Sequence, residues 1–290
     1  MSFNPSARLD PSQVQDRRGR MGGAGPVLAG GGGISVLLLV AALLLGVNPA
    51  DIVSPNTAVE YPQSSVAQTT QECQTGADAN RRADCRVVGF VNSIQEYWRG
   101  EFARRGRQYQ PAQTVLFSNA TESGCGLASE AQGPFYCPDD GNVYLDLTFF
   151  QELQQRFGAR GGPFAQAYVV AHEYGHHVQD QLGLLSGGAT QARGAQGGSV
   201  RVELMADCLA GVWARNAADT GYLQPPTDQD VADALDAAAA VGDDRIQRQT
   251  QGRVTPETWT HGSSQQRQQW FTTGYKSGNL DSCNTTSGRI

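Results

Sequence analysis

Apolar side chains recur at helical spacing in several stretches of the chain. One series of positions three or four residues apart predicts an amphipathic helix. Capping and stop signals predict further helices at 148–157, 163–182 and 200–213. The helix at 148–157 would open with a capping box made by Thr148 and Gln151. The apolar series consists of Val87, Val91, Ile94, Trp98 and Phe102.

Short β-prone runs lie between these predicted helices. Thr114–Phe117 and 143–147 are rich in β-branched and aromatic residues. Phe135–Cys137 precedes a Pro-Asp-Asp-Gly turn at 138–141, which predicts a hairpin with the run at 143–147. Several helices together with one small sheet indicate an α+β fold.

An uncharged apolar run extends from residue 34 to residue 47, and Arg17, Arg18 and Arg20 precede it. Extended back to residue 26, the run reaches the length of about 20 residues that a membrane-spanning helix needs. The alternative is a cleaved secretory signal, but the stretch before the run is long for one and no clear cleavage site follows. The arginines favour a single-pass membrane protein with a cytoplasmic N-terminus and the rest of the chain extracytoplasmic.

These signals divide the chain into four parts: a cytoplasmic tail at 1–25, a membrane anchor at 26–47, a flexible linker at 48–71 and a folded domain at 72–290. A chain of 290 residues is long enough for such a domain to bury a substantial core. The chain has 22 basic and 28 acidic side chains, which give a net charge of −6. Nucleic-acid-binding proteins usually have an excess of basic residues, and this chain has none. We therefore expect no nucleic-acid partner.

All six cysteines follow the apolar run. An even number of cysteines in an exported region indicates disulfides, and the alternative is a set of buried free thiols. Six cysteines permit 15 pairings, and loop-closure entropy favours neighbours only modestly. Our hypothesis is the pairing of neighbours, which joins Cys73 to Cys85, Cys125 to Cys137 and Cys208 to Cys283.

The predicted helix at 163–182 carries the sequence His172-Glu173-Tyr-Gly-His176. His172 and His176 are offset by only about 40° around a helix, so their imidazoles point to one place, and neutral imidazoles suit zinc. Glu173 flanks them and can accept a proton from a water without being a ligand. His177 points about 100° away from His176 and is predicted to lie outside the ligand set. These residues indicate a hydrolytic metalloenzyme with one zinc ion.

A catalytic zinc usually takes three protein ligands, so a third donor is needed. The metzincin pattern would need glycine and histidine where the chain has Gln179 and Leu182. Glu203 and Asp207 share one face of the helix at 200–213, and we predict Glu203 as the third ligand, with Asp207 accepting a hydrogen bond from a ligand histidine. The alternative is two solvated acids on an ordinary helix. The apolar residues around them argue against this, because unpaired buried acids are costly.

Several sequence blocks, taken in order, resemble the bacterial neutral zinc metallopeptidases, which are similar to gluzincins in carrying a Glu-x-x-x-Asp helix after the histidine helix. The resemblance covers nearly the whole chain and implies a zincin-like peptidase fold. Tyr174 stands where related sequences often have an aliphatic residue, which leaves the ligands unaffected. The blocks are Asp-Arg-Arg-Gly at 16–19, Gly-Pro-Phe-Tyr-Cys-Pro at 133–138, Val-Tyr-Leu-Asp at 143–146, the histidine motif at 172–179, Ala-Asp-Cys-Leu-Ala-Gly at 206–211 and Thr-His-Gly-Ser-Ser at 260–264.

His261 is the remaining histidine, on a turn before a helix that Ser263 and Gln266 can cap. Metallopeptidases need a donor toward the oxyanion of the tetrahedral intermediate, and His261 is a catalytic candidate for this role. Arg267 and Tyr275 are weaker candidates. The alternative is that His261 is only a turn residue.

Taken together, these features predict a membrane-anchored zinc peptidase that acts on a protein or peptide substrate. Zinc lowers the pKa of a bound water to about 7, and Glu173 would take the proton as that water attacks the scissile carbonyl. The alternative is a noncatalytic envelope protein in which the same ligands hold a structural zinc and support partner binding. An open coordination position separates the two, because a fourth protein ligand would close the site.

Overall fold

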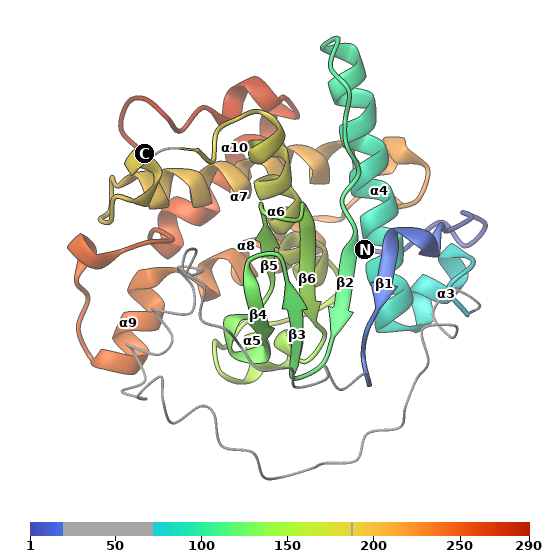
Figure 1. Ribbon diagram of the computed structural model, residues 1–290, viewed down its shortest axis with the longest axis horizontal. Helices are drawn as coiled ribbons and strands as arrows, with labels where there is room; N and C mark the ends of the chain where they lie inside the picture. The colour runs from blue at the N-terminus through green and yellow to red at the C-terminus, as the bar shows by residue number, and fades with distance from the viewer. Residues whose placement is uncertain (20–71, 187) are drawn as a thin grey trace.

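The computed structural model describes residues 1–19, 72–186 and 188–290 (Figure 1). These residues combine many helices with two small sheets, which confirms the predicted α+β fold. The predicted anchor at 26–47 and linker at 48–71 lie outside the described residues. Among the described residues, no helix has the length and apolar character that a bilayer span requires.

A four-stranded sheet contains the runs predicted to be β-prone. Three of its strands are parallel, and β5 runs antiparallel to β6 across the predicted hairpin turn. Both faces are buried because helices cover one and a separate hairpin, β3 with β4, packs on the other. In sheet order the strands are β1 (Val14–Asp16), β2 (Thr114–Phe117), β6 (Asn142–Asp146) and β5 (Phe135–Cys137), and the hairpin comprises β3 (Ala120–Ser123) and β4 (Gly126–Ser129).

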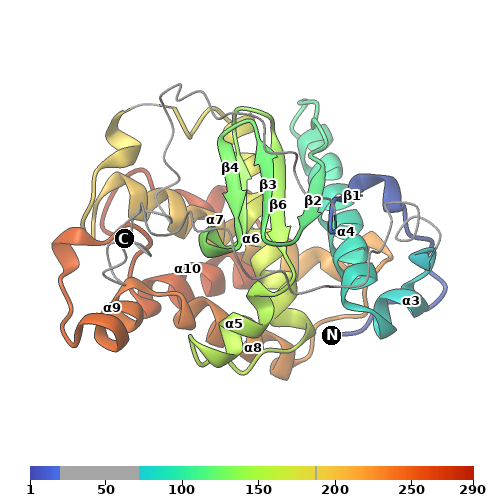
Figure 2. The same cartoon turned by 60° about the horizontal axis from the view of Figure 1, so that its bottom comes forward.

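Helix α6 is central to the helical part. It packs against α4, α7 and α8 and also against β5 and β6 (Figures 1 and 2). Tyr174 of α6 is fully buried, and its hydroxyl oxygen lies 2.9 Å from that of Thr114 on β2. The sheet therefore holds the helix that carries the histidine motif. The helices are α3 (Gly76–Arg81), α4 (Ala83–Arg104), α5 (Phe149–Gln155), α6 (Pro163–Gln181), α7 (Gly198–Asn216), α8 (Asp228–Ala240), α9 (Asp243–Gln251) and α10 (Ser264–Ser277).

The capping box predicted for the start of α5 is wrong. Thr148 itself has helical φ and ψ angles of −67° and −26°, and its side chain caps no helix N–H. Its backbone N–H and its hydroxyl both donate to Asp146 Oδ1 at 2.8 Å. The carboxylate at the end of β6 thus accepts the N–H that Gln151 would bind in a capping box.

Residues 1–19 belong to the folded domain. Strand β1 pairs with β2, with Val14 opposite Thr114, and Phe3 and Leu9 are also buried. This differs from the tail predicted for 1–25. The contributing segments are too short to show a hydrophobic period, so their packing leaves no pattern in the sequence.

The three disulfides join Cys73 to Cys85, Cys125 to Cys137 and Cys208 to Cys283, which confirms the pairing of neighbours. The first ties the start of the second described segment to α4. The second ties the β3–β4 hairpin to β5. The third ties α7 to the C-terminal end of the chain. None of the described cysteines is a free thiol.

Removing the Cys208–Cys283 disulfide is expected to destabilise the protein more than removing Cys125–Cys137. A cross-link restricts the unfolded chain, and the restriction grows with the closed loop. The sequence separations are 75 and 12 residues, so we expect losses of roughly 4 and 3 kcal/mol. Urea unfolding of the two double Cys→Ala variants measures both losses. A larger loss from the shorter loop would contradict this expectation.

Candidate metal centre

Two neighbouring helices supply the predicted ligands. His172 and His176 lie one turn apart on α6, and Glu203 lies on α7. The helices approach closely at Gly175, where a β-carbon would lie 2.9 Å from the backbone oxygen of Ala206. A side chain at this position would push α7 away. The glycine within the histidine motif therefore brings Glu203 to the imidazoles.

The three side chains converge on one point with spacings that fit a zinc ion. Glu203 Oε2 lies 3.2 Å from His172 Nε2, and Glu203 Oε1 lies 3.6 Å from His176 Nε2. All three candidate ligand atoms lie within 4.8 Å of one another. Ligand atoms about 2.1 Å from a tetrahedral zinc are roughly 3.4 Å apart, and two imidazole nitrogens with a carboxylate oxygen form a donor set typical of zinc. The described residues thus bring the predicted ligand set together.

Asp207 fixes the orientation of His172. Its Oδ1 accepts from His172 Nδ1 at 2.8 Å and from the hydroxyl of Tyr168, while Arg267 on α10 donates to both carboxylate oxygens, at 2.8 and 3.0 Å. Burial tends to raise the pKa of Asp207, but the charges of Arg267 and His172 hold it below its usual range. Asp207 therefore stays ionised and directs the other imidazole nitrogen, Nε2, toward Glu203.

Gln179 plays the corresponding part for His176. Its Oε1 lies 2.8 Å from His176 Nδ1, and its amide Nε2 donates to the backbone oxygen of Val202 at 2.7 Å. Gln179 is 1% exposed and links α6 to α7. This contact with His176 was not among the expectations from the sequence. The position of Gln179 three residues after His176 on one helix was the available signal for contact.

Carboxylates determine the charge of the cluster. Burial tends to lower the pKa of His172, but the charge and hydrogen bond of Asp207, together with the hydrogen bond of Glu203, raise it to about 10. Burial tends to raise the pKa of Glu203, but the charge of His176 and the hydrogen bond of His172 hold it well below its usual range. In the absence of a metal the two carboxylates therefore favour the protonated form of His172, and the same two negative charges would favour a bound cation.

Glu173 adjoins the cluster without joining it. The side chain is buried, and its charge interacts with those of His172, His176 and Glu203. Burial raises the pKa of Glu173, against the charges of the two histidines, which act to lower it. A raised pKa makes this carboxylate a stronger proton acceptor at neutral pH.

Asp243 holds His261 beside the cluster. Asp243 Oδ2 accepts three backbone N–H groups of residues 260–262, at 2.7 to 3.0 Å, and its Oδ1 lies 3.2 Å from His261 Nδ1. Burial tends to lower the pKa of His261, but the hydrogen bond of Asp243 and the charge of Glu203 raise it. Asp243 was not predicted from the sequence, because nothing local connects the first residue of α9 with a turn 17 residues later.

The other side chains singled out in the sequence have different surroundings. His177 is buried on the sheet side of α6, with its ring nitrogens 3.2 Å from the Tyr136 hydroxyl and 2.7 Å from the backbone oxygen of Gln110. It lies outside the group formed by His172, His176 and Glu203. Arg267 donates to Asp207, so its guanidinium is already engaged, and the ring of Tyr275 stacks on that of Phe271.

Comparisons with known proteins bear on this site. The chain is 51% identical over 253 residues to the uncharacterized protein Rv2575 of Mycobacterium tuberculosis (strain ATCC 25618 / H37Rv), which covers 85% of each chain. It is 39% identical over 289 residues to the uncharacterized protein YpfJ of Escherichia coli (strain K12), which covers 96% of each. No solved structure matches the chain. The family described as "Putative neutral zinc metallopeptidase" matches residues 5–286, and the chain therefore belongs to this family.

Proposed function

We propose that the protein is a zinc-dependent peptidase that hydrolyses peptide bonds in a protein or peptide substrate. His172, His176 and Glu203 are the proposed ligands of one zinc ion. The main support for this proposal is the number of candidate ligands. Among the described residues, no fourth histidine, cysteine or carboxylate lies with these three. Three ligands leave a position for water and substrate, whereas structural zinc sites are usually closed by four protein ligands.

The chain's own residues have distinct tasks in the proposed reaction. When bound, zinc would supply a Lewis acid that acidifies a water and polarises a carbonyl oxygen. Glu173 accepts a proton from the attacking water and can pass it to the leaving amine. Asp207 and Gln179 keep the ligand imidazoles oriented through their Nδ1 atoms.

Gln179→Ala is expected to weaken zinc binding by about 10- to 100-fold, because His176 loses the acceptor that orients its ring. Gln181→Ala is the matched control. Gln181 lies two residues later on α6 but bonds to the backbone of Gln110, and we expect zinc affinity to stay unchanged in this variant. Competition with a zinc-binding dye measures both affinities. Equal affinities in the two variants would contradict the role of Gln179.

We further propose that His261 donates a hydrogen bond to the oxyanion that forms during peptide hydrolysis. Asp243 accepts from its Nδ1 and helps raise the pKa of His261, which favours the doubly protonated ring, and Nε2–H of that ring is the proposed donor. His261→Ala is expected to keep its zinc and to lower kcat by about 10²- to 10³-fold, the usual cost of losing one oxyanion donor. Zinc content and steady-state rates check this together. Full activity in this variant would restrict His261 to a role in the turn.

The proposed location of the domain is extracytoplasmic. The three disulfides support it, because such bonds persist in oxidising compartments and are rare in the cytosol. Association with the membrane through residues 26–47 is part of the proposal and rests on the sequence pattern alone.

Zinc-edge X-ray absorption on the full chain distinguishes a peptidase from a protein with a structural zinc. The proposal predicts two imidazole nitrogens, one carboxylate and an exchangeable oxygen ligand that a hydroxamate displaces. A structural zinc would show four protein ligands and an unchanged spectrum with the hydroxamate. That second result would contradict the proposed function.

A further inference from the structure

Residues 1–19 are bound along one side of the domain. Phe3 is buried, and its ring centre lies 5.0 Å from that of Phe90 on α4. The backbone N–H and oxygen of Phe3 both bond to the side-chain amide of Asn80 on α3. The backbone N–H of Leu9 donates to the backbone oxygen of Gln74 at 2.9 Å. These contacts combine burial with paired backbone groups, as in the interior of a domain.

The domain provides a fitted place for this segment. A β-carbon at Gly76 would lie 2.0 Å from the backbone oxygen of Asn4, so only glycine leaves room for the N-terminal backbone there. Asn92 is 1% exposed, and its amide accepts from the backbone N–H of Asp10 at 2.7 Å and donates to the backbone oxygen at 3.0 Å. Strand β1 then extends the sheet beside β2. Without residues 1–19, a buried amide would lose both partners.

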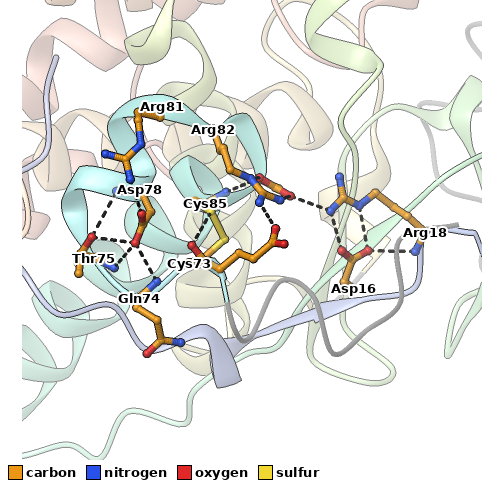
Figure 3. Close-up of a disulfide and its surroundings, with 11 residues drawn as sticks. Asp16, Arg18, Cys73, Gln74, Thr75, Asp78, Arg81, Arg82 and Cys85 are labelled. Atoms are coloured by element: carbon orange, nitrogen blue, oxygen red, sulfur yellow. Dashed lines mark hydrogen bonds and ion pairs between the residues drawn. A yellow bond between two sulfur atoms is a disulfide. The ribbon is translucent and has the colours of Figure 1, made fainter. Parts of the chain in front are cut away.

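The residues just before and just after the segment 20–71 meet at one place in the fold. Arg18 donates to Asp84, at the start of α4, over 3.0 Å. Arg82 donates to the same carboxylate oxygen of Asp84 over 2.8 Å and also pairs with Glu72. Figure 3 shows Arg18 and Arg82 on either side of this point, near the first disulfide. The two ends of the segment 20–71 are therefore joined through one buried carboxylate.

This arrangement is incompatible with a single membrane crossing between the two parts. One crossing at 26–47 would place residues 1–19 and 72–290 on opposite sides of the bilayer, where β1 could not pair with β2. We infer that residues 1–19 and 72–290 lie on the same side of the membrane and fold as one unit. The inference goes beyond the proposed peptidase activity and does not depend on it.

Arg17 and Arg18, two of the three arginines that favoured a cytoplasmic N-terminus, have partners in the fold, and the third, Arg20, lies outside the described residues. Arg17 donates to the backbone oxygen of Glu122 on β3, at 3.0 Å. Arg18 binds Asp16 as well as Asp84. Because these charges are used within the folded domain, they do not report the orientation of the chain in a membrane, as unpaired arginines in a flanking loop would.

Labelling of introduced cysteines tests the inference, since the described native cysteines are all in disulfides. Gln15 is exposed on β1, and Gln249 is exposed on α9 and serves as the matched position in the second part. Full chains with Gln15→Cys or Gln249→Cys are treated in intact spheroplasts with a maleimide that does not cross membranes. We expect the two cysteines to be labelled to the same extent. Adding detergent should make any protected thiol accessible to the maleimide.

Labelling of both positions supports the inference together with the extracytoplasmic location. Protection of both supports the inference and contradicts only the proposed location. Labelling of Gln249→Cys with protection of Gln15→Cys would overturn the inference, because it would place the two parts on opposite sides. The peptidase activity of the purified protein is measured separately, so failure of one proposal does not imply failure of the other.

A cross-link tests the packing itself. Arg8 and Thr75 are antiparallel bridge partners flanked by two backbone hydrogen bonds, which makes them a non-hydrogen-bonded pair with Cα atoms about 4.5 Å apart. A disulfide fits that spacing. The experiment uses cells in which Gln249→Cys is labelled from outside, and free thiols are blocked while the cells are intact. We expect Arg8→Cys/Thr75→Cys to form the extra disulfide before lysis. The control pair Gln15→Cys/Thr75→Cys is expected to form no such disulfide. A link that forms only after detergent is added would overturn the inference.

Discussion

Replacing Glu173 with glutamine is expected to lower the rate of peptide hydrolysis by about 10²- to 10⁴-fold while zinc content stays the same. The side chain lies beside the ligand cluster and not in it, so its loss removes a proton acceptor and no ligand. Glutamine has nearly the same shape, and the change also removes a buried carboxylate, so the fold should persist. Steady-state rates on a peptide substrate and metal analysis of the same preparation measure the two effects.

Glu152→Gln provides the control for this substitution. Glu152 allows the same Glu→Gln change on α5, where its carboxylate lies 3.6 Å from the guanidinium of Arg156. We expect its activity to match the wild-type protein. Unchanged turnover in Glu173→Gln would contradict the proposed mechanism, and loss of zinc from that variant would make Glu173 a ligand.

Glu203→Ala and Asp207→Ala are expected to fail in different ways, although both residues lie on one face of α7. Removing Glu203 deletes one of three ligands and should nearly abolish zinc retention. Removing Asp207 leaves three ligands and should weaken zinc affinity by about 10- to 100-fold, because His172 loses its orienting partner. Metal affinity in the two variants measures the difference.

Asp207→Ala should also be the less stable protein. It leaves the guanidinium of Arg267, which is 3% exposed, without its carboxylate. Breaking a buried pair by removing one partner costs about 3 to 5 kcal/mol, so the metal-free variant should unfold at clearly lower urea concentrations than metal-free Glu203→Ala. Complete zinc loss in Asp207→Ala with full occupancy in Glu203→Ala would reverse the ligand assignment.

The contact between the two histidines proposed as ligands could be predicted because it is local. A separation of four residues on a helix places His172 and His176 side by side whatever the rest of the chain does. Glu203 could be proposed as a third ligand from the spacing of acids on an apolar helix. The contact itself depends on how closely α6 and α7 pack at Gly175, which no periodicity expresses.

The residues that hold Asp207 and His261 in place were harder to predict because their partners are distant in sequence. Arg267 reaches Asp207 across 60 residues, and Asp243 reaches the turn of His261 across 18. Such contacts follow from helix packing, which brings α10 against α7 and α9. The packing of residues 1–19 was missed for a related reason. Its strand has three residues, and the partner strand begins about a hundred residues later.

A zinc titration of peptide hydrolysis tests whether the protein is a zinc-dependent peptidase. The full chain is stripped with a chelator, shown to be folded, and returned to zinc in steps while cleavage of a labelled unfolded protein is followed. We expect no cleavage by the stripped protein and a rise in rate that ends at one equivalent of zinc. Glu173→Gln should bind the same equivalent and remain inactive. A folded protein that takes up one equivalent of zinc and cleaves neither unfolded proteins nor peptides would contradict the proposed function.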